Sequence, residues 1–216
     1  MRATERETRR RASAETAPCH NRARPAVSSI RVCPSPPHWK PARRLRRAMP
    51  VDVASWVFDP GSLTARLQAR CPDAFRVRVL FQGRRRPQAN ESAALGLRRC
   101  DGGAVIRQVH LYCGDLPVVF ARTVIPVHTL TGRTRRLGHL RDKPLGAALF
   151  ADPGMRRGEL EAARLLPGMA GFDVLVGPDP AESSRQGIWG RRSVFHVDGK
   201  PLLVSEIFLP ALFGEA

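Results

Sequence analysis

The sequence predicts a domain built on an antiparallel β-sheet together with short helices. Residues 104–124 and 187–210 each hold two apolar runs, separated by a Gly-Asp or an Asp-Gly turn signal. Such dipeptides between runs rich in β-branched and aromatic residues are typical of β-hairpins. Leu63 and Leu67 recur four residues apart, which indicates a helix ahead of the first hairpin.

The composition divides the chain at residue 48. The net charge is +17, from 36 Lys and Arg against 19 Asp and Glu, and much of this excess lies in residues 1–48. This segment is rich in Arg, Pro, Ala and Ser and has no sustained apolar periodicity, so we expect it to be disordered. It could be a natural basic tail, a transit peptide, or sequence that precedes a true start at Met49. We expect the folded domain to span residues 49–216.

Several functional classes lack their sequence signals. No run approaches the roughly 18 apolar residues of a membrane span. The chain has 5 cysteines without CxxC spacing and 6 histidines without an HExxH motif. No Walker A sequence or strand-borne GxGxxG occurs, so we expect no metal and no cofactor. The cysteines favour a reducing cytoplasm, and His110 and His196 are expected to be ordinary half-buried strand residues.

The elements between the hairpins are predicted from local signals. Asp59-Pro60 favours a helix start, and that helix should end near Cys71. Alternation over 75–81 predicts an amphipathic strand, while the polar stretch 83–97 indicates a mobile loop or covering flap. Stretches 129–140 and 144–150 are predicted short helices, the second with outward N–H groups around Leu145 that suit an anion. The period leaves 157–166 undecided between helix and strand, and 167–187 is interpreted as an inserted loop.

Glu206 is the unusual residue of the closing hairpin. Alternate residues of a strand share a face, so Glu206 shares one with Leu202, Val204 and Phe208. A carboxylate on an apolar face needs a partner, a stabilised protonated form or a chemical role.

Arg107 is the corresponding lone charge of the first hairpin, on a face with Val105, Val109 and Leu111. The two hairpins can be overlaid without a gap at an offset of 84 residues, which places Arg107 on Arg191 and Arg122 on Glu206. This repeat favours a sheet with pseudo-symmetric halves.

The other charges leave alternatives open. Arg107 and Glu206 could simply form a buried ion pair across the sheet. Arg191 and Arg192 alternate in direction, so only one of them points inward, and we expect the other to be solvated. By its overlay on Glu206, Arg122 could also approach a cavity.

The blocks VVFARTVIPVHTLTG, LRDKPLGAALF and GIWGRRSVFHVDGKPLLVSEIFLP closely resemble the chorismate pyruvate-lyase family, over roughly residue 51 to the C-terminus. The resemblance implies an α+β fold, chorismate lyase-like, in which an antiparallel sheet is flanked by helices and a buried ligand cavity lies under flaps. It also implies no cofactor.

The resemblance further implies the site residues. Arg107 in AVIRQVHLY matches the family's carboxylate-binding arginine, and Glu206 in LLVSEIFLP matches its last-strand carboxylate, so both are candidate catalytic residues. Leu145 in the KPLG block matches a main-chain contact to the ligand. Leu63 corresponds to a methionine of the family, which makes it the least certain match. If Glu206 holds a proton, it could move that proton between ring and side chain, or it could bind the hydroxyl group.

The implied function is conversion of chorismate to 4-hydroxybenzoate and pyruvate for ubiquinone biosynthesis, by a cytoplasmic monomer without nucleic-acid or membrane partners. The alternative is a non-enzymatic effector-binding domain, because bacterial transcription regulators use the same fold. Those regulators carry an N-terminal winged helix, for which residues 1–48 are too short and irregular. A basic nucleic-acid-binding protein is a third interpretation, but it rests on the tail alone.

Overall fold

The computed structural model describes residues 35–98, 103–169, 175 and 187–214. They belong to a compact unit that begins at Cys33, and the other unit, Met1–Val32, lies outside the described residues. The strands are β1 (Lys40–Pro41), β2 (Phe75–Arg85), β3 (Ala104–Cys113), β4 (Leu116–Pro126), β5 (Arg156–Arg157), β6 (Glu161–Leu165), β7 (Ile188–Val197) and β8 (Lys200–Phe208). The α-helices are α1 (Ala42–Leu45), α2 (Val51–Val57), α3 (Leu63–Arg70), α4 (Ala89–Ala94) and α5 (Leu145–Phe150). Short 3-10 helices are η1 (Arg46–Ala48), η2 (Val127–Thr129), η3 (Gly132–His139) and η4 (Pro210–Phe213).

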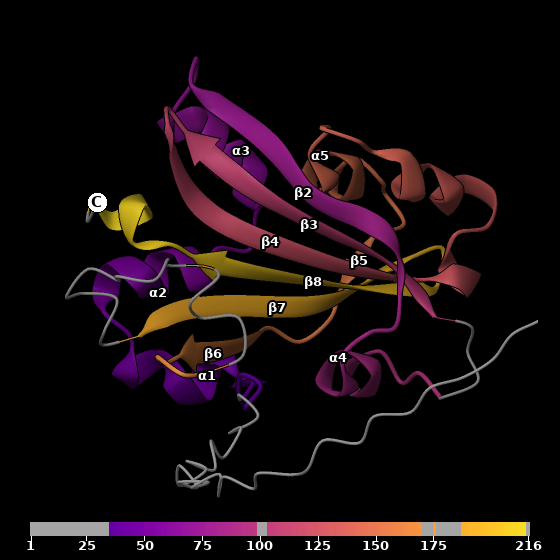
Figure 1. Cartoon of the computed structure of the whole chain (residues 1–216), viewed down its shortest axis with the longest axis horizontal. Coiled ribbons are helices and arrows are strands. Elements are labelled where there is room, and N and C mark those ends of the chain that lie inside the picture. The colour runs from indigo at the N-terminus through magenta and orange to yellow at the C-terminus, as the bar shows by residue number, and fades with distance from the viewer. Residues whose placement is uncertain (1–34, 99–102, 170–174, 176–186, 215–216) are drawn as a thin grey trace, which may run out of the picture. The chain divides into compact units, whose positions relative to one another are not determined.

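Within the described residues, the strands form one antiparallel sheet in the order β1-β6-β7-β8-β4-β3-β2, with β5 paired to β7 (Figure 1). The predicted hairpins are β3–β4 and β7–β8, and their second strands pair with each other at the centre. Asp198 and Gly199 both have positive φ, 51° and 72°, as a two-residue type I′ turn requires. The predicted antiparallel sheet with accompanying helices is therefore confirmed.

A β-bulge makes the two hairpins differ by one residue. The register of β3 and β4 shifts between Leu111 and Tyr112, whereas β7 and β8 pair without a shift. Beyond the bulge, Arg107 faces Thr123 in one hairpin while Arg191 faces Glu206 in the other. The overlay of Arg107 on Arg191 thus holds, but Thr123, and not Arg122, is the structural counterpart of Glu206.

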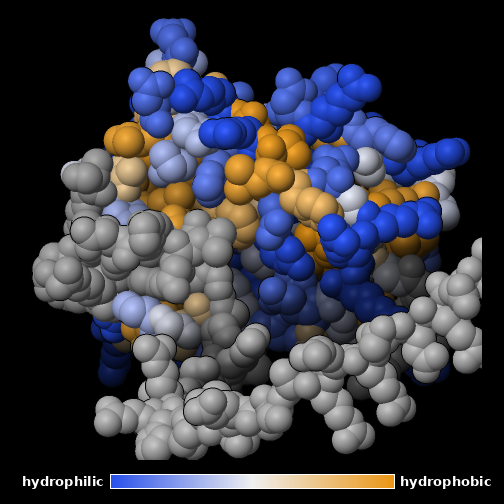
Figure 2. Space-filling view, viewed as in Figure 1, coloured by the Kyte–Doolittle hydropathy of each residue, from blue (hydrophilic) through white to orange (hydrophobic). Residues whose placement is uncertain are grey.

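The two faces of the sheet carry different helices. One face packs against α2 and α3 through a core that includes Trp56, Val57, Leu67 and Phe208. On the opposite face, Leu95 at the end of α4 packs with a separate core of Ile106, Val124 and Leu203. In Figure 1, α4 lies on its own, apart from α2, α3 and α5. Figure 2 shows hydrophilic side chains interspersed with smaller hydrophobic patches on the visible face of the described chain.

The prediction of an irregular loop over 83–97 is wrong for most of that stretch. Strand β2 continues to Arg85, and α4 follows, with a capping box in which Gln88 and Glu91 exchange side-chain and backbone hydrogen bonds. Glu91 is only 4% exposed, and its buried charge is compensated by an ion pair with Arg122. The polarity of this stretch indicated a loop. The sequence did not reveal that Glu91 is paired with Arg122, a residue distant in the chain, and can therefore be buried in a helix.

Helix α3 begins later than predicted. The Ser62 hydroxyl accepts from the backbone N–H of Ala65 and caps the helix, while Asp59 instead accepts from the N–H of Gly61 in a turn. The undecided stretch 157–166 contributes to two strands, β5 and β6, and the predicted helix at 144–150 is α5. The insertion interpreted over 167–187 lies mostly outside the described residues.

The chain is ordered ahead of the boundary expected at residue 48. Residues 40–48 form β1, α1 and η1, and Ala42 is 1% exposed in the core. The backbone N–H of Ala42 donates to the carbonyl of Leu160, which attaches this segment to the sheet. Among the described helices, none combines the length and apolar character needed to cross a bilayer.

Cys71 and Cys113 form a disulfide that joins the end of α3 to the end of β3. The reducing environment inferred from the cysteines did not predict this pair, whose members lie 42 residues apart in the sequence. The cysteines therefore no longer support a cytoplasmic location, which stays an expectation from the family resemblance.

We predict that opening this disulfide lowers the free energy of unfolding by about 2–4 kcal/mol, because it closes a loop of 42 residues in the unfolded chain. Urea unfolding of the chain with and without a thiol reductant measures the difference. A Cys71→Ala/Cys113→Ala variant is the control, since its stability should not respond to the reductant. Equal midpoints for the oxidised and reduced chain would contradict the prediction.

Candidate functional site

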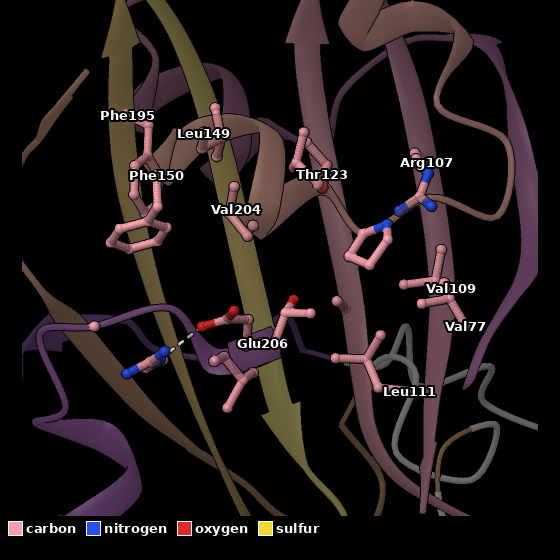
Figure 3. Close-up of a pocket in the computed structure, with 18 of the residues that line it drawn as sticks. Val77, Arg107, Val109, Leu111, Thr123, Leu149, Phe150, Phe195, Val204 and Glu206 are labelled. Carbon is pink, nitrogen blue, oxygen red and sulfur yellow. Dashed lines mark hydrogen bonds and ion pairs between the residues drawn. The ribbon is translucent and has the colours of Figure 1, made fainter. Parts of the chain in front are cut away.

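A pocket lies between the sheet and the N-terminal ends of α3 and α5 (Figure 3). Its cavity volume is about 40 Å³, which holds about three water molecules. The lining is apolar apart from a few hydroxyl groups and charged side chains. The lining residues are Gly61, Leu63, Thr64, Val77, Arg107, Val109, Leu111, Ala121, Thr123, Pro144, Leu145, Gly146, Leu149, Phe150, Arg157, Arg191, Phe195, Val204 and Glu206.

The four residues that the family resemblance assigns to the site all line this pocket. Leu63 and Leu145 are the first residues of α3 and α5, and both are buried. Arg107 and Glu206 come from β3 and β8, and Figure 3 shows them at opposite sides of the pocket. The strand alternation predicted from the sequence is confirmed, since the apolar neighbours of each charge point to the same face.

Arg107 is 3% exposed and has unused hydrogen-bonding capacity. Its Nη2 donates to the carbonyl oxygens of Arg141 and Lys143, at 2.8 and 3.0 Å. Its Nε is buried and has no partner within the described residues. Burial lowers the pKa of Arg107, and the charge of Asp142 partly opposes this shift. A buried donor without an acceptor is costly, so the geometry suits an anionic ligand at this side.

Glu206 is held by a partner that the sequence interpretation did not assign to it. Arg191, its cross-strand neighbour, donates from Nε to Oε2 of Glu206 at 2.6 Å, which is the dashed contact in Figure 3. Arg191 is 1% exposed, and its Nη1 also donates to the carbonyls of Trp56 and Asp59, each at 2.8 Å. Glu206 therefore has a charged partner, which is one of the outcomes expected for a carboxylate on this face.

The alternative of a direct ion pair between Arg107 and Glu206 does not apply. Among the described ion pairs, Glu206 joins Arg191, and Arg107 takes part in none. The two residues remain separate charges on one pocket.

Arg157 is a further lining residue, located on the short strand β5. Its Nε donates to the Ser193 hydroxyl at 3.1 Å, and its guanidinium lies 5.4 Å from the centre of the Phe195 ring. Contacts of its Nη1 with the carbonyls of Asp59 and Pro60 are long, at 3.4 and 3.5 Å. Burial lowers the pKa of Arg157, as does the nearby charge of Arg191, while Glu206 and Asp59 raise it.

Two other arginines differ from expectation. Arg122 points to the face of α4 and pairs with Glu91 at 2.6 Å, so it does not approach the pocket. Arg192, expected to be solvated, is 7% exposed, pairs with Glu161 at 2.7 Å and stacks on Trp39. Each acquires a carboxylate from a distant part of the chain, which strand alternation alone does not reveal.

Histidines His110 and His196 are partly buried strand residues, as expected. Burial lowers the pKa of His110, with a contribution from Arg78. Neither histidine lines this pocket. Among the described residues, no cluster of metal-binding side chains occurs.

Sequence reasoning did not identify Arg157 and did not assign Arg191 a role. The available signal for Arg191 was its overlay on Arg107, which indicated the same face. No comparable signal existed for Arg157, because the period around it did not distinguish helix from strand.

The chain matches known proteins over most of its length. The family model for chorismate lyase matches residues 33–216. A probable chorismate pyruvate-lyase of Methylococcus capsulatus is 42% identical over 167 residues, covering 75% of this chain and 97% of the relative. A probable chorismate pyruvate-lyase of Aromatoleum aromaticum is 40% identical over 183 residues, covering 85% of this chain and 97% of the relative.

Among solved structures, the effector domain of PhnF from Mycobacterium smegmatis is similar with a TM-score of 0.51 at 15% identity, covering 70% of this chain and 90% of that one. At this identity the likeness concerns the fold alone. The family model covers both the sheet and the elements that line the pocket, and the relatives are 40% or more identical to the chain, which therefore belongs to the chorismate lyase family.

Proposed function

We propose that this chain is a chorismate pyruvate-lyase that converts chorismate to 4-hydroxybenzoate and pyruvate, with the product used for ubiquinone biosynthesis. The observation that carries the proposal is one pocket with a buried, incompletely bonded Arg107 on one side and Glu206, oriented by Arg191, on the other. The names of relatives about 40% identical to this chain support it.

The reaction needs no external reactant. The C3–O bond to the enolpyruvyl group breaks, the hydrogen on C4 leaves as a proton, and the ring becomes aromatic. The departing enolpyruvate gains a proton and becomes pyruvate, so all atoms of chorismate appear in the two products. Because aromatisation supplies driving force, the protein mainly has to orient the substrate and control the proton.

Arg107 binds the ring carboxylate in this proposal. Its Nη2 is held by the backbone of residues 141 and 143, which leaves Nε and Nη1 for the ligand. A guanidinium held in place by backbone contacts loses little further freedom on binding. In an apolar pocket, its charge-assisted hydrogen bonds are stronger than they are in water.

Glu206 acts at the opposite end of the ring, which is para to the carboxylate. Arg191 occupies Oε2, and Oε1 has no hydrogen bond among the described residues. The free oxygen can accept a hydrogen bond from the C4 hydroxyl group and receive the proton that leaves C4. In this role the carboxylate acts as a general base, while Arg191 holds it in position.

The substrate can enter only if the elements that close the pocket move. A six-membered ring with two carboxylates is larger than a cavity of about 40 Å³. The lining residues outside the sheet belong to α3, α5 and the segments just before these helices, so we expect these elements to shift. Leu63 and Leu145, at the starts of the two helices, then contact the ligand.

The test is to incubate the full chain with chorismate and to follow the formation of 4-hydroxybenzoate and pyruvate. Equal amounts of both products support the proposal. Binding of chorismate without turnover would instead support a non-enzymatic effector domain, whose fold this chain shares.

We predict that Arg107→Gln weakens binding of both chorismate and 4-hydroxybenzoate by roughly 10- to 150-fold, because one buried charge-assisted contact is lost. Titration calorimetry with 4-hydroxybenzoate and steady-state kinetics with chorismate measure the two effects. Arg78→Gln, which changes an exposed arginine of the adjacent strand β2, is the control. Unchanged product affinity in Arg107→Gln would contradict the assigned role.

We predict that Glu206→Gln lowers kcat by about 100-fold or more, since the amide cannot receive the proton. Glu161→Gln is a matched control, because Glu161 also pairs with a buried arginine of β7, but on the opposite face. Both variants are compared by steady-state kinetics and thermal melting. If Glu206→Gln kept nearly full kcat with only weaker binding, Glu206 would bind the hydroxyl group without transferring a proton.

A further inference from the structure

The charged residues that line the pocket are Arg107, Arg157, Arg191 and Glu206. Arg191 and Glu206 neutralise each other as an ion pair. Arg107 and Arg157 are left without a carboxylate in ion-pairing distance among the described residues. The pocket thus presents two positive charges, which matches a dianion better than a monoanion.

Arg157 is close to the Glu206 side of the pocket. Its Nε bonds to Ser193, which lies on the same face of β7 as Arg191. The charges of Arg191 and Glu206 both act on Arg157, whereas Arg107 lies across the sheet on β3. The two uncompensated arginines therefore belong to different ends of the pocket.

Chorismate has its charges in a corresponding arrangement. The ring carboxylate is at C1, the hydroxyl group is at C4, and the enolpyruvyl ether with its own carboxylate is at C3, next to C4. With the ring carboxylate on Arg107 and the hydroxyl group on Glu206, the enolpyruvyl carboxylate lies at the end of the pocket that Arg157 occupies.

Arg157 has hydrogen-bonding capacity for such a group. Its carbonyl contacts are at 3.4 and 3.5 Å, near the limit of a hydrogen bond. Its Nη2 makes no hydrogen bond within the described part of the chain. Of the two acids whose charges act on Arg157, Glu206 is paired with Arg191 and Asp59 is paired with Arg66.

We propose that Arg157 binds the enolpyruvyl carboxylate of chorismate and is the residue that distinguishes substrate from product. This inference rests on the proposed lyase function. The product 4-hydroxybenzoate has only the ring carboxylate, so it engages Arg107 but has no group for Arg157. Arg157 thereby contributes to substrate binding without an equal contribution to retention of the aromatic product.

A purely structural role makes a different prediction. Arg157 also stacks on Phe195 and contacts the segment between α2 and α3, so it could simply hold β5 in place. In that case, its loss would disturb the whole pocket and weaken all ligands alike.

The experiment compares a dianionic and a monoanionic ligand in the full chain. Arg157→Met keeps an unbranched side chain against Phe195 but removes the charge, and Arg157→Lys keeps the charge. The non-reacting probe 3-(1-carboxyvinyloxy)benzoate, which has both carboxylates, and 4-hydroxybenzoate are titrated into each protein by calorimetry. Chorismate kinetics are measured in parallel, with Arg156→Met, at the exposed neighbour on β5, as the control.

We expect Arg157→Met to bind the dianionic probe roughly 10- to 150-fold more weakly and to raise KM for chorismate, while its affinity for 4-hydroxybenzoate changes less than about threefold. Arg157→Lys should recover part of the loss. Equal weakening of both ligands, or no change in either, overturns the inference. If the unaltered chain does not turn over chorismate, the lyase proposal itself fails, and the binding ratios still report whether Arg157 selects a second carboxylate.

Discussion

The buried pair between Arg191 and Glu206 is the interaction on which the site depends. Removing two charges from water is costly, and the cost is offset here by a short contact and by the backbone carbonyls that bind the remaining arginine donors. Those carbonyls belong to Trp56 and Asp59, at the end of α2 and just beyond it. One guanidinium therefore orients the carboxylate and also attaches the segment leading to α3 to the sheet.

Much of this arrangement followed from local sequence rules. Two-residue turn signals located both hairpins, and the period of two along a strand placed Arg107 and Glu206 on apolar faces. The KPLG block correctly located the start of α5 near Leu145. These inferences succeeded because turns and side-chain alternation are determined by neighbouring residues.

The failures have a common physical cause. The bulge in the first hairpin moved Arg122 to the other face of the sheet, and its partner Glu91 came from a stretch interpreted as a loop. Likewise, the Cys71–Cys113 disulfide and the contacts of Arg157 join segments distant in the chain. Such pairings depend on which strands lie next to each other in the sheet. Local sequence patterns do not specify that order.

The distribution of charge then explains how a small pocket can treat substrate and product differently. Arg191 is committed to Glu206, so the pocket's excess positive charge resides on Arg107 and Arg157 at its two ends. A ligand with carboxylates at both ends satisfies both arginines, and cleavage converts it into two monoanions. After cleavage, the carboxylate that Arg157 binds belongs to pyruvate, which is no longer attached to the ring. Arg157 therefore no longer helps to hold the aromatic product. The contact between Arg157 and the enolpyruvyl carboxylate thus contributes to substrate binding but not to binding of the aromatic product. This difference favours product release and turnover.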